Sequence, residues 1–75
     1  MKQVLEFVAK SLVDNPDAVT VTEVDGEDGI VLELRVSEGD MGKVIGRQGR
    51  IAKAIRTVVK AAANRENKRV SVEII

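Results

Sequence analysis

The stretch MGKVIGRQGRIAKAIRTVVKAAA, residues 41–63, decides the fold of this chain. Its spacing predicts a short helix over Met41–Ile45 and a long helix over about Gly49–Asn64, separated by Gly46-Arg47-Gln48-Gly49. Asp40 precedes the short helix and suits its N-cap position. Glycine at both ends of the break permits backbone conformations that other residues resist, so we expect a sharp turn between the two helices.

The long helix separates into two sides when its residues are placed 100° apart. An apolar side, expected to pack on the core, consists of Ile51, Ala54, Ile55, Val58, Val59 and Ala62. The opposite side is polar and holds Arg50, Lys53, Thr57, Lys60 and Asn64, with Arg56 at its edge. The basic residues therefore form a stripe that begins at the glycine-bounded break.

Hydrophobic spacing predicts four further elements outside this stretch. They are a helix over Lys2–Val13, strands over Asp17–Val24 and Ile30–Val36, and a last strand in which Val70, Val72 and Ile74 alternate with polar residues. Proline disfavours helix in the residue before it, so Asn15-Pro16 ends the first helix. Asp25–Gly29 is a turn between the first two strands, because Asp-Gly is a strong hairpin signal.

The resulting order α-β-β-α-α-β predicts an α+β fold in which residues 1–75 form one domain. The first two strands are expected to pair antiparallel as a hairpin. The last strand follows a helical crossover and should therefore run parallel to the second. The simplest architecture is a three-stranded mixed sheet that is packed on one face by three helices.

Composition argues against several kinds of function. The chain has no cysteine and no histidine, so it lacks thiolate metal ligands, disulfides and the usual general base. Residues 42–49 do not fit the phosphate-binding loop of nucleotide hydrolases. We therefore expect no enzyme activity, no metal and no cofactor. No apolar run approaches a membrane span and no signal-peptide pattern opens the chain, which makes a cytoplasmic protein the expectation.

The net charge of zero hides an uneven distribution. Residues 1–40 carry 3 basic and 10 acidic side chains, a net charge of −7, whereas residues 41–75 carry 9 basic and 2 acidic side chains, a net charge of +7. A polyanion is attracted by basic side chains that gather on one face, whatever the total charge. The stripe on the long helix therefore favours a polyanion partner over a merely solvated surface.

The break at Gly46–Gly49 lies directly before a helix N-terminus. Unpaired N–H groups and the helix dipole at such a position favour a phosphate group. Arg47 and Arg50 add mobile positive charge, and Gln48 adds a neutral hydrogen-bonding group. The alternative is a helix–turn–helix whose glycines serve only steric needs, but the adjoining basic stripe favours a site for a sugar-phosphate backbone.

The run GKVIGRQGRI, residues 42–51, resembles the KH-domain signature, in which V-I-G-x-x-G precedes a helix that begins with a basic and an apolar residue. The resemblance covers nearly the whole chain and is to the bacterial, type II form, which includes small proteins with a single KH domain. It implies binding of single-stranded RNA, with about four nucleotides clamped across the G-x-x-G loop. The backbone contacts would come from Gly46, Arg47, Gln48 and Gly49, supported by Lys43, Arg50 and Lys53. A base-facing groove would be formed by Val44, Ile45, Ile51 and the edge of the central strand.

The same resemblance implies partners and roles. Proteins of this kind self-associate as homodimers or pair with a larger KH protein of the KhpB type. They are linked to RNA chaperoning and post-transcriptional regulation and, in some bacteria, to cell-wall elongation and division. The competing hypothesis for this chain is an assembly adaptor, in which protein contacts come first and RNA binding is secondary.

Two features lower the affinity that we expect for RNA. Asp25–Gly29, expected at the far side of the groove, carries only negative charge and should repel RNA. Phe7 is the only aromatic residue, so bases have almost no stacking partners. We therefore expect weak binding with little sequence preference. Phe7 itself lies among polar positions of the first helix, where it either folds over the rim of the core or offers a protein contact.

Overall fold

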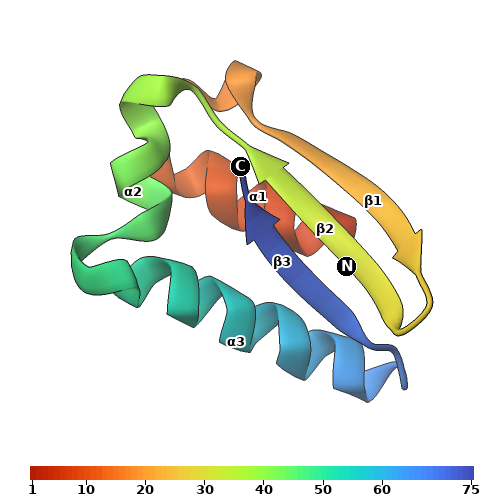
Figure 1. Ribbon diagram of the computed structural model, residues 1–75. Helices are drawn as coiled ribbons and strands as arrows, with labels where there is room; N and C mark the ends of the chain where they lie inside the picture. Colours follow the sequence, from red (N-terminus) through yellow and green to blue (C-terminus); the bar gives the residue numbers. More distant parts are fainter.

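A computed structural model describes all 75 residues and confirms the predicted α+β order (Figure 1). The helices are α1 (Lys2–Leu12), α2 (Met41–Ile45) and α3 (Arg50–Arg65), and the strands are β1 (Thr20–Gly26), β2 (Gly29–Arg35) and β3 (Val70–Ile74). Short 3₁₀ turns lie at Pro16–Ala18, Glu38–Asp40 and Arg47–Gly49. The type II KH architecture expected from the sequence is therefore present.

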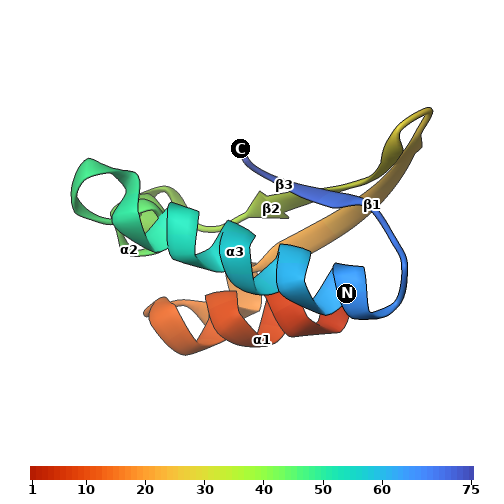
Figure 2. The same ribbon diagram turned by 90° about the horizontal axis from the view of Figure 1, so that it is seen from below.

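The three strands form one mixed sheet in the order β1-β2-β3. β1 pairs antiparallel with β2, with Val21 opposite Leu34, and β2 pairs parallel with β3, with Leu32 opposite Val72. α1 and α3 lie on one face of the sheet and leave the other face uncovered, and α2 lies beside the end of the sheet (Figure 2). Both predictions about strand pairing are confirmed.

The core lies between the sheet and the helices and consists of aliphatic side chains. Its largest fully buried members are Leu5, Leu32, Leu34, Val44 and Val59. These side chains come from α1, from the central strand β2, and from α2 and α3, the two helices that flank the glycine-bounded loop. Burial of each such side chain stabilises the fold by roughly 1.5–3 kcal/mol, so this cluster fixes where α2 and α3 meet.

The packed face of α3 differs from the predicted one. Its buried residues are Ala52, Ile55, Val59 and Ala63, whereas Ala54 and Val58 of the expected apolar side are exposed. Ile55 and Val59 of the predicted side are buried as expected, whereas the buried Ala52 and Ala63 were not among the predicted residues. The helix instead turns small alanines toward its neighbours, and small residues allow a helix to approach a packed layer closely.

Both limits of the first strand differ from the prediction by two residues or more. The first strand begins at Thr20 rather than Asp17, because Pro16 starts a 3₁₀ turn in which the Val19 N–H donates to the Pro16 carbonyl at 3.1 Å. Proline presets the φ that such a turn needs. The hairpin turn is also shorter than expected, since the ladder continues until Gly26 pairs with Gly29.

Candidate nucleic-acid interface

The break between α2 and α3 is a tight loop at an outer corner of the molecule (Figure 1). Gly46 ends α2 with φ 76° and ψ 174°, and Gln48 and Gly49 follow with φ 59° and 73°. The Gly49 N–H donates to the Gly46 carbonyl at 3.2 Å and closes the turn. Three positive φ values within four residues turn the chain sharply, so that α3 starts immediately at Arg50.

The two glycines of this loop have different reasons for being glycine. A Cβ on Gly46 would lie 2.6 Å from Cγ1 of Ile51, so no side chain fits between the loop and α3. At Gly49 a Cβ would meet no heavy atom within 4 Å, and only the positive φ disfavours a side chain there. Gly46 is therefore required by packing, whereas Gly49 leaves backbone open to solvent and to a ligand.

The N-terminus of α3 is free to receive an anion. No side chain caps it, and its first turn contains no acidic residue. The first N–H groups of a helix have no partner within the helix, and the helix dipole adds positive potential at this end. A phosphate oxygen at this corner would satisfy donors that no protein side chain satisfies.

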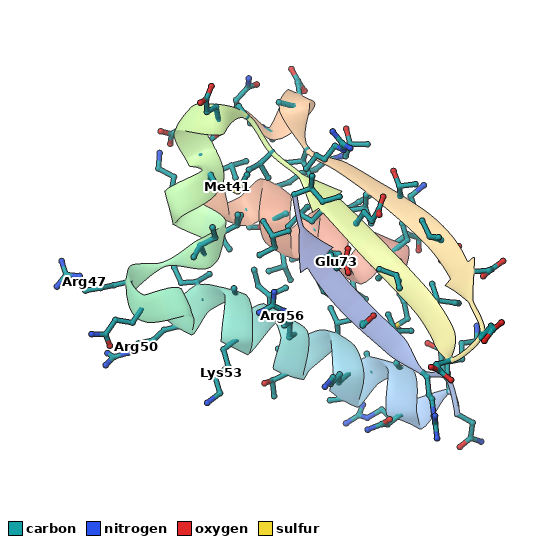
Figure 3. All side chains as sticks on the ribbon, viewed as in Figure 1. Met41, Arg47, Arg50, Lys53, Arg56 and Glu73 are labelled. Carbon is teal, nitrogen blue, oxygen red and sulfur yellow. The ribbon has the colours of Figure 1, made fainter.

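Three of the predicted basic residues gather at this corner. Arg47 and Arg50 project outward from the loop, and Lys53 projects from the next turn of α3 (Figure 3). All three side chains are exposed, and Nη2 of Arg50 donates to Oε1 of Gln48 at 3.3 Å. The structure thus brings Arg47, Gln48, Arg50 and Lys53 together around the open backbone of Gly49.

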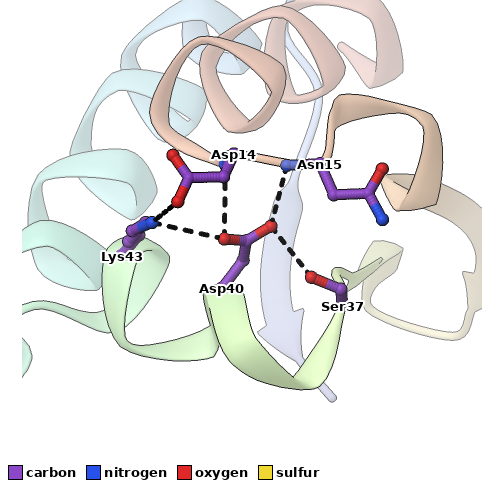
Figure 4. Close-up of polar contacts among 5 residues, drawn as sticks. All are labelled: Asp14, Asn15, Ser37, Asp40 and Lys43. Atoms are coloured by element: carbon purple, nitrogen blue, oxygen red, sulfur yellow. Dashed lines mark hydrogen bonds and ion pairs between the residues drawn. The ribbon is translucent and has the colours of Figure 1, made fainter.

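Lys43 does not join this group. Its Nζ contacts a carboxylate oxygen of Asp14 and lies 3.5 Å from Oδ1 of Asp40 (Figure 4). The hydrogen bond to Asp14, together with both negative charges, raises the pKa of Lys43 even though partial burial works in the opposite direction. Its charge is compensated within the protein, so it adds little to the potential at the loop.

Asp40 organises this polar cluster. Its side chain is buried and accepts hydrogen bonds from the N–H groups of Asp14 at 3.2 Å and Asn15 at 3.0 Å, and from Ser37 Oγ at 2.8 Å (Figure 4). The Ser37 hydrogen bond is the main cause that lowers the pKa of Asp40. Asp40 occupies the predicted N-cap position of α2, but its carboxylate makes no cap hydrogen bond to that helix. It ties the start of α2 to the segment after α1.

The three apolar residues predicted for the groove occupy different environments. Val44 is fully buried in the core, so we expect it to support the loop from below rather than to meet a base. Ile45 is 36% exposed, and Ile51 is half-buried against Gly46. Ile45 and Ile51 are therefore the members of this set that a ligand can reach.

The sequence predicted that the edge of the central strand lines the groove, but the structure exposes the edge of another strand on this side. The central strand β2 has no open edge, because it pairs with β1 on one side and β3 on the other. The carbonyl of Arg69 and the N–H of Ile75 point toward β2. Since strand residues alternate in direction, the backbone groups of Val70, Val72 and Ile74 point the other way. The open edge beside α3 thus belongs to β3.

Arg56 reaches this open edge and was not predicted to do so. Its Nε donates to the Val72 carbonyl at 3.2 Å, and its side chain lies between α3 and β3 (Figure 3). The only sequence signal was its place at the border of the polar side of α3. Because the hydrogen bond uses Nε, the terminal guanidinium nitrogens keep their donors for another partner.

Neither a metal centre nor a membrane-spanning helix is part of this structure. No group of three or more acidic, histidine or cysteine side chains is placed to hold a metal ion. None of the helices combines the length and the apolar character needed to cross a bilayer.

Comparison with known proteins places these features in a family. The family model described as "KhpA/KhpB, KH domain" matches residues 2–74. A protein named "RNA-binding protein KhpA" from Clostridium acetobutylicum is 73% identical over 75 residues, which is the full length of both chains. Proteins of the same name from Clostridium perfringens and Caldanaerobacter subterraneus subsp. tengcongensis are 71% and 63% identical, again over the full length of both chains.

Proposed function

The chain belongs to the KhpA/KhpB family of KH domains, and we propose that it is a small RNA-binding protein. In this proposal it holds the backbone of single-stranded RNA at the Gly46–Gly49 loop and has little sequence preference. The relatives described above carry RNA binding in their names, which supports the choice of ligand. The resemblance to the KH-domain family adds a role in RNA chaperoning or post-transcriptional regulation to this proposal.

One observation carries the proposal: the uncapped start of α3 and three exposed basic side chains face the same corner. Backbone N–H groups and Arg47, Arg50 and Lys53 together suit a bent stretch of sugar-phosphate. Phosphate contacts bind without reading sequence. The bases then have only Ile45, Ile51 and the β3 edge to contact, and no aromatic side chain there to stack on, which favours low specificity.

The proposal is tested by placing negative charge at the phosphate position. A labelled, unstructured RNA is titrated with wild type and with Arg47→Asp/Gln48→Asp, and fluorescence anisotropy is followed at several salt concentrations. Both glycines remain, so the loop should keep its shape. We expect affinity to fall about tenfold or more, and the wild-type log–log salt slope to be about −0.7 per phosphate contacted.

Gln3→Asp/Arg35→Asp is the matched control. It makes the same two chemical changes at exposed positions on α1 and on the last residue of β2, away from the loop. If both double variants stay folded and lose affinity equally, only the overall charge matters and the loop is not the site. Melting temperature and light scattering on the same samples report folding and oligomeric state.

A second function, assembly with another KH protein, is favoured by exposed apolar surface. Phe7 on α1 is 74% exposed and so does not fold over the core, and Val58 on α3 is 51% exposed. Pairing with a second copy or with a larger KhpB-type protein would cover such side chains. Light scattering and pull-down with Val58→Asp test this, because a buried charge should weaken association while the loop stays intact. Unchanged association would exclude this face of α3 as the contact.

A further inference from the structure

β1 is an edge strand, and its outer side pairs with no other strand. It stands at the end of the order β1-β2-β3 and forms one border of the molecule (Figure 1). Its register with β2 is unbroken from Thr20 to Gly26, so no bulge interrupts it. Proteins usually protect such an edge with a lysine, a proline, a bulge or a covering segment. β1 contains neither lysine nor proline.

The direction of the backbone groups on β1 follows from the pairing of β2. The N–H of Ile30 and the carbonyl of Leu34 form hydrogen bonds on the β3 side of β2, at 2.9 Å and 3.0 Å. Since residues alternate along a strand, the odd-numbered residues of β2 bond to β1. Their partners in the register are even-numbered residues, so the odd-numbered residues of β1 point outward. Val21 is buried, which leaves the backbone groups of Glu23 and Asp25 free.

The free edge, defined here as Thr22–Gly26, is exposed over its whole length and carries only negative charge. Glu23 and Asp25 are two residues apart, so their side chains lie on the same face of the sheet. Neither of them forms an ion pair. Glu27 and Asp28 continue the negative charge into the hairpin turn. A strand that pairs with the free edge therefore meets carboxylates that no cation of this chain neutralises.

A second copy of the chain does not suit the free edge. Two β1 strands paired with each other would bring their carboxylates together, and like charges on neighbouring strands repel. β3 contains Glu73 but no lysine or arginine. The basic stripe lies on α3, where the backbone groups are already used within the helix and cannot pair with a strand. Charge complementarity therefore points to an extended basic segment of another protein.

We propose that the free edge binds a protein segment in which lysine or arginine occupies alternate positions. The segment adds to the sheet as a fourth strand, so that main-chain hydrogen bonds give affinity and alternate side chains give specificity. Its basic side chains lie on the same face as Glu23 and Asp25, and the residues between them lie beside Thr22 and Val24 on the other face. The free edge and the Gly46–Gly49 loop are at opposite borders of the molecule, so this binding does not depend on RNA (Figure 1).

Amide hydrogen exchange in the full chain, followed by NMR, first tests whether the edge is free. The N–H groups of Thr22 and Val24 bond to β2, so we expect them to exchange at least about tenfold more slowly than those of Glu23 and Asp25. Equally slow exchange at all four positions would overturn the inference, because the edge would already be covered. Light scattering on the same sample then shows whether a second copy covers it.

A nonapeptide of alternating lysine and threonine is the probe for the binding itself. We expect it to slow amide exchange of Glu23 and Asp25 about tenfold at saturation, because these N–H groups gain partners. The same peptide with all amide nitrogens methylated keeps the charges but has no backbone donors, and it should have no effect. Equal effects of the two peptides would show charge attraction without strand pairing, and no effect of either would show no binding. Both results overturn the inference.

Reversing the charge of the edge tests the specificity. Glu23→Lys/Asp25→Lys should no longer bind the lysine peptide and should bind a peptide of alternating glutamate and threonine instead. Asp17→Lys/Glu38→Lys is the matched control, because it makes the same chemical changes at exposed positions outside β1 and should keep the preference for the lysine peptide. Melting temperatures report folding. Equal loss in both folded variants would overturn the assignment to this edge, and the comparison of the two lysine peptides on wild type does not depend on either variant.

Discussion

Nε of Arg56 donates a hydrogen bond to the Val72 carbonyl at 3.2 Å and so connects α3 to the open edge of β3. Arg56→Met keeps the aliphatic stem and removes the donor. We expect this variant to lose about 1 kcal/mol of unfolding free energy. Lys53→Met is the control. Lys53 is exposed on α3 and forms no ion pair, so this variant should change the free energy of unfolding by less than about 0.5 kcal/mol. Equal urea midpoints for both variants would contradict a stabilising role for the hydrogen bond.

The two loop glycines should respond differently to alanine. Gly46→Ala meets Ile51 at 2.6 Å and forces a φ of 76° with ψ of 174°, so we expect a loss of about 2 kcal/mol or more. Gly49→Ala meets open space and pays only for its left-handed backbone, about 1 kcal/mol. Urea unfolding of the two variants measures this difference, and a larger loss at Gly49 would argue against the packing of Gly46 described here.

The titration of Asp40 should make the free energy of unfolding depend on pH in the acid range. Its pKa is lowered by folding, chiefly through the hydrogen bond from Ser37, so its carboxylate stabilises the fold above the ordinary value of 3.8. That contribution is lost as the pH falls below 3.8 and through the lower pKa of the folded state. Unfolding free energy measured against pH should therefore fall more steeply in wild type than in Asp40→Asn. Parallel curves would show that Asp40 titrates alike in the folded and unfolded states.

Val58 and Val59 are neighbours with the same side chain and opposite environments. Val59 is 1% exposed and Val58 is 51% exposed. Val59→Ala should cost about 2 kcal/mol, from lost burial and the cavity left behind. Val58→Ala should cost less than about 0.5 kcal/mol. Thermal or urea unfolding decides between this orientation of α3 and the one predicted from hydrophobic spacing.

Lys43 and Lys53 should differ in RNA binding although both lie near the loop in sequence. Lys43 is held by Asp14 and Asp40, whereas Lys53 is exposed without an ion-pair partner. Lys53→Gln should reduce the magnitude of the log–log salt slope by about 0.7, and Lys43→Gln should leave it nearly unchanged. Anisotropy titrations over a range of salt concentrations measure both slopes. The reverse ranking would place the RNA on the Asp14 side of α2.

Local patterns predicted most of the architecture. The order of helices and strands follows from hydrophobic spacing, because apolar residues recur with different periods in helices and in strands. The break between α2 and α3 follows from glycines at positions 46 and 49, both of which have positive φ. The antiparallel and parallel pairings follow from the lengths of the connections, because a short turn and a helical crossover each permit one direction. The candidate loop was therefore identified before its geometry was known.

Local patterns could not predict contacts between side chains that are distant in the sequence. Lys43 looks like part of the basic loop in sequence, but it contacts Asp14, 29 residues away. Arg56 donates a hydrogen bond to Val72, which lies 16 residues away in the sequence. The sequence alone determined the elements, the loop and the uneven charge, because these depend on neighbouring residues. Only the tertiary structure decided the rotation of α3, the open strand edge and the neutralised lysine, because these depend on how separate elements pack.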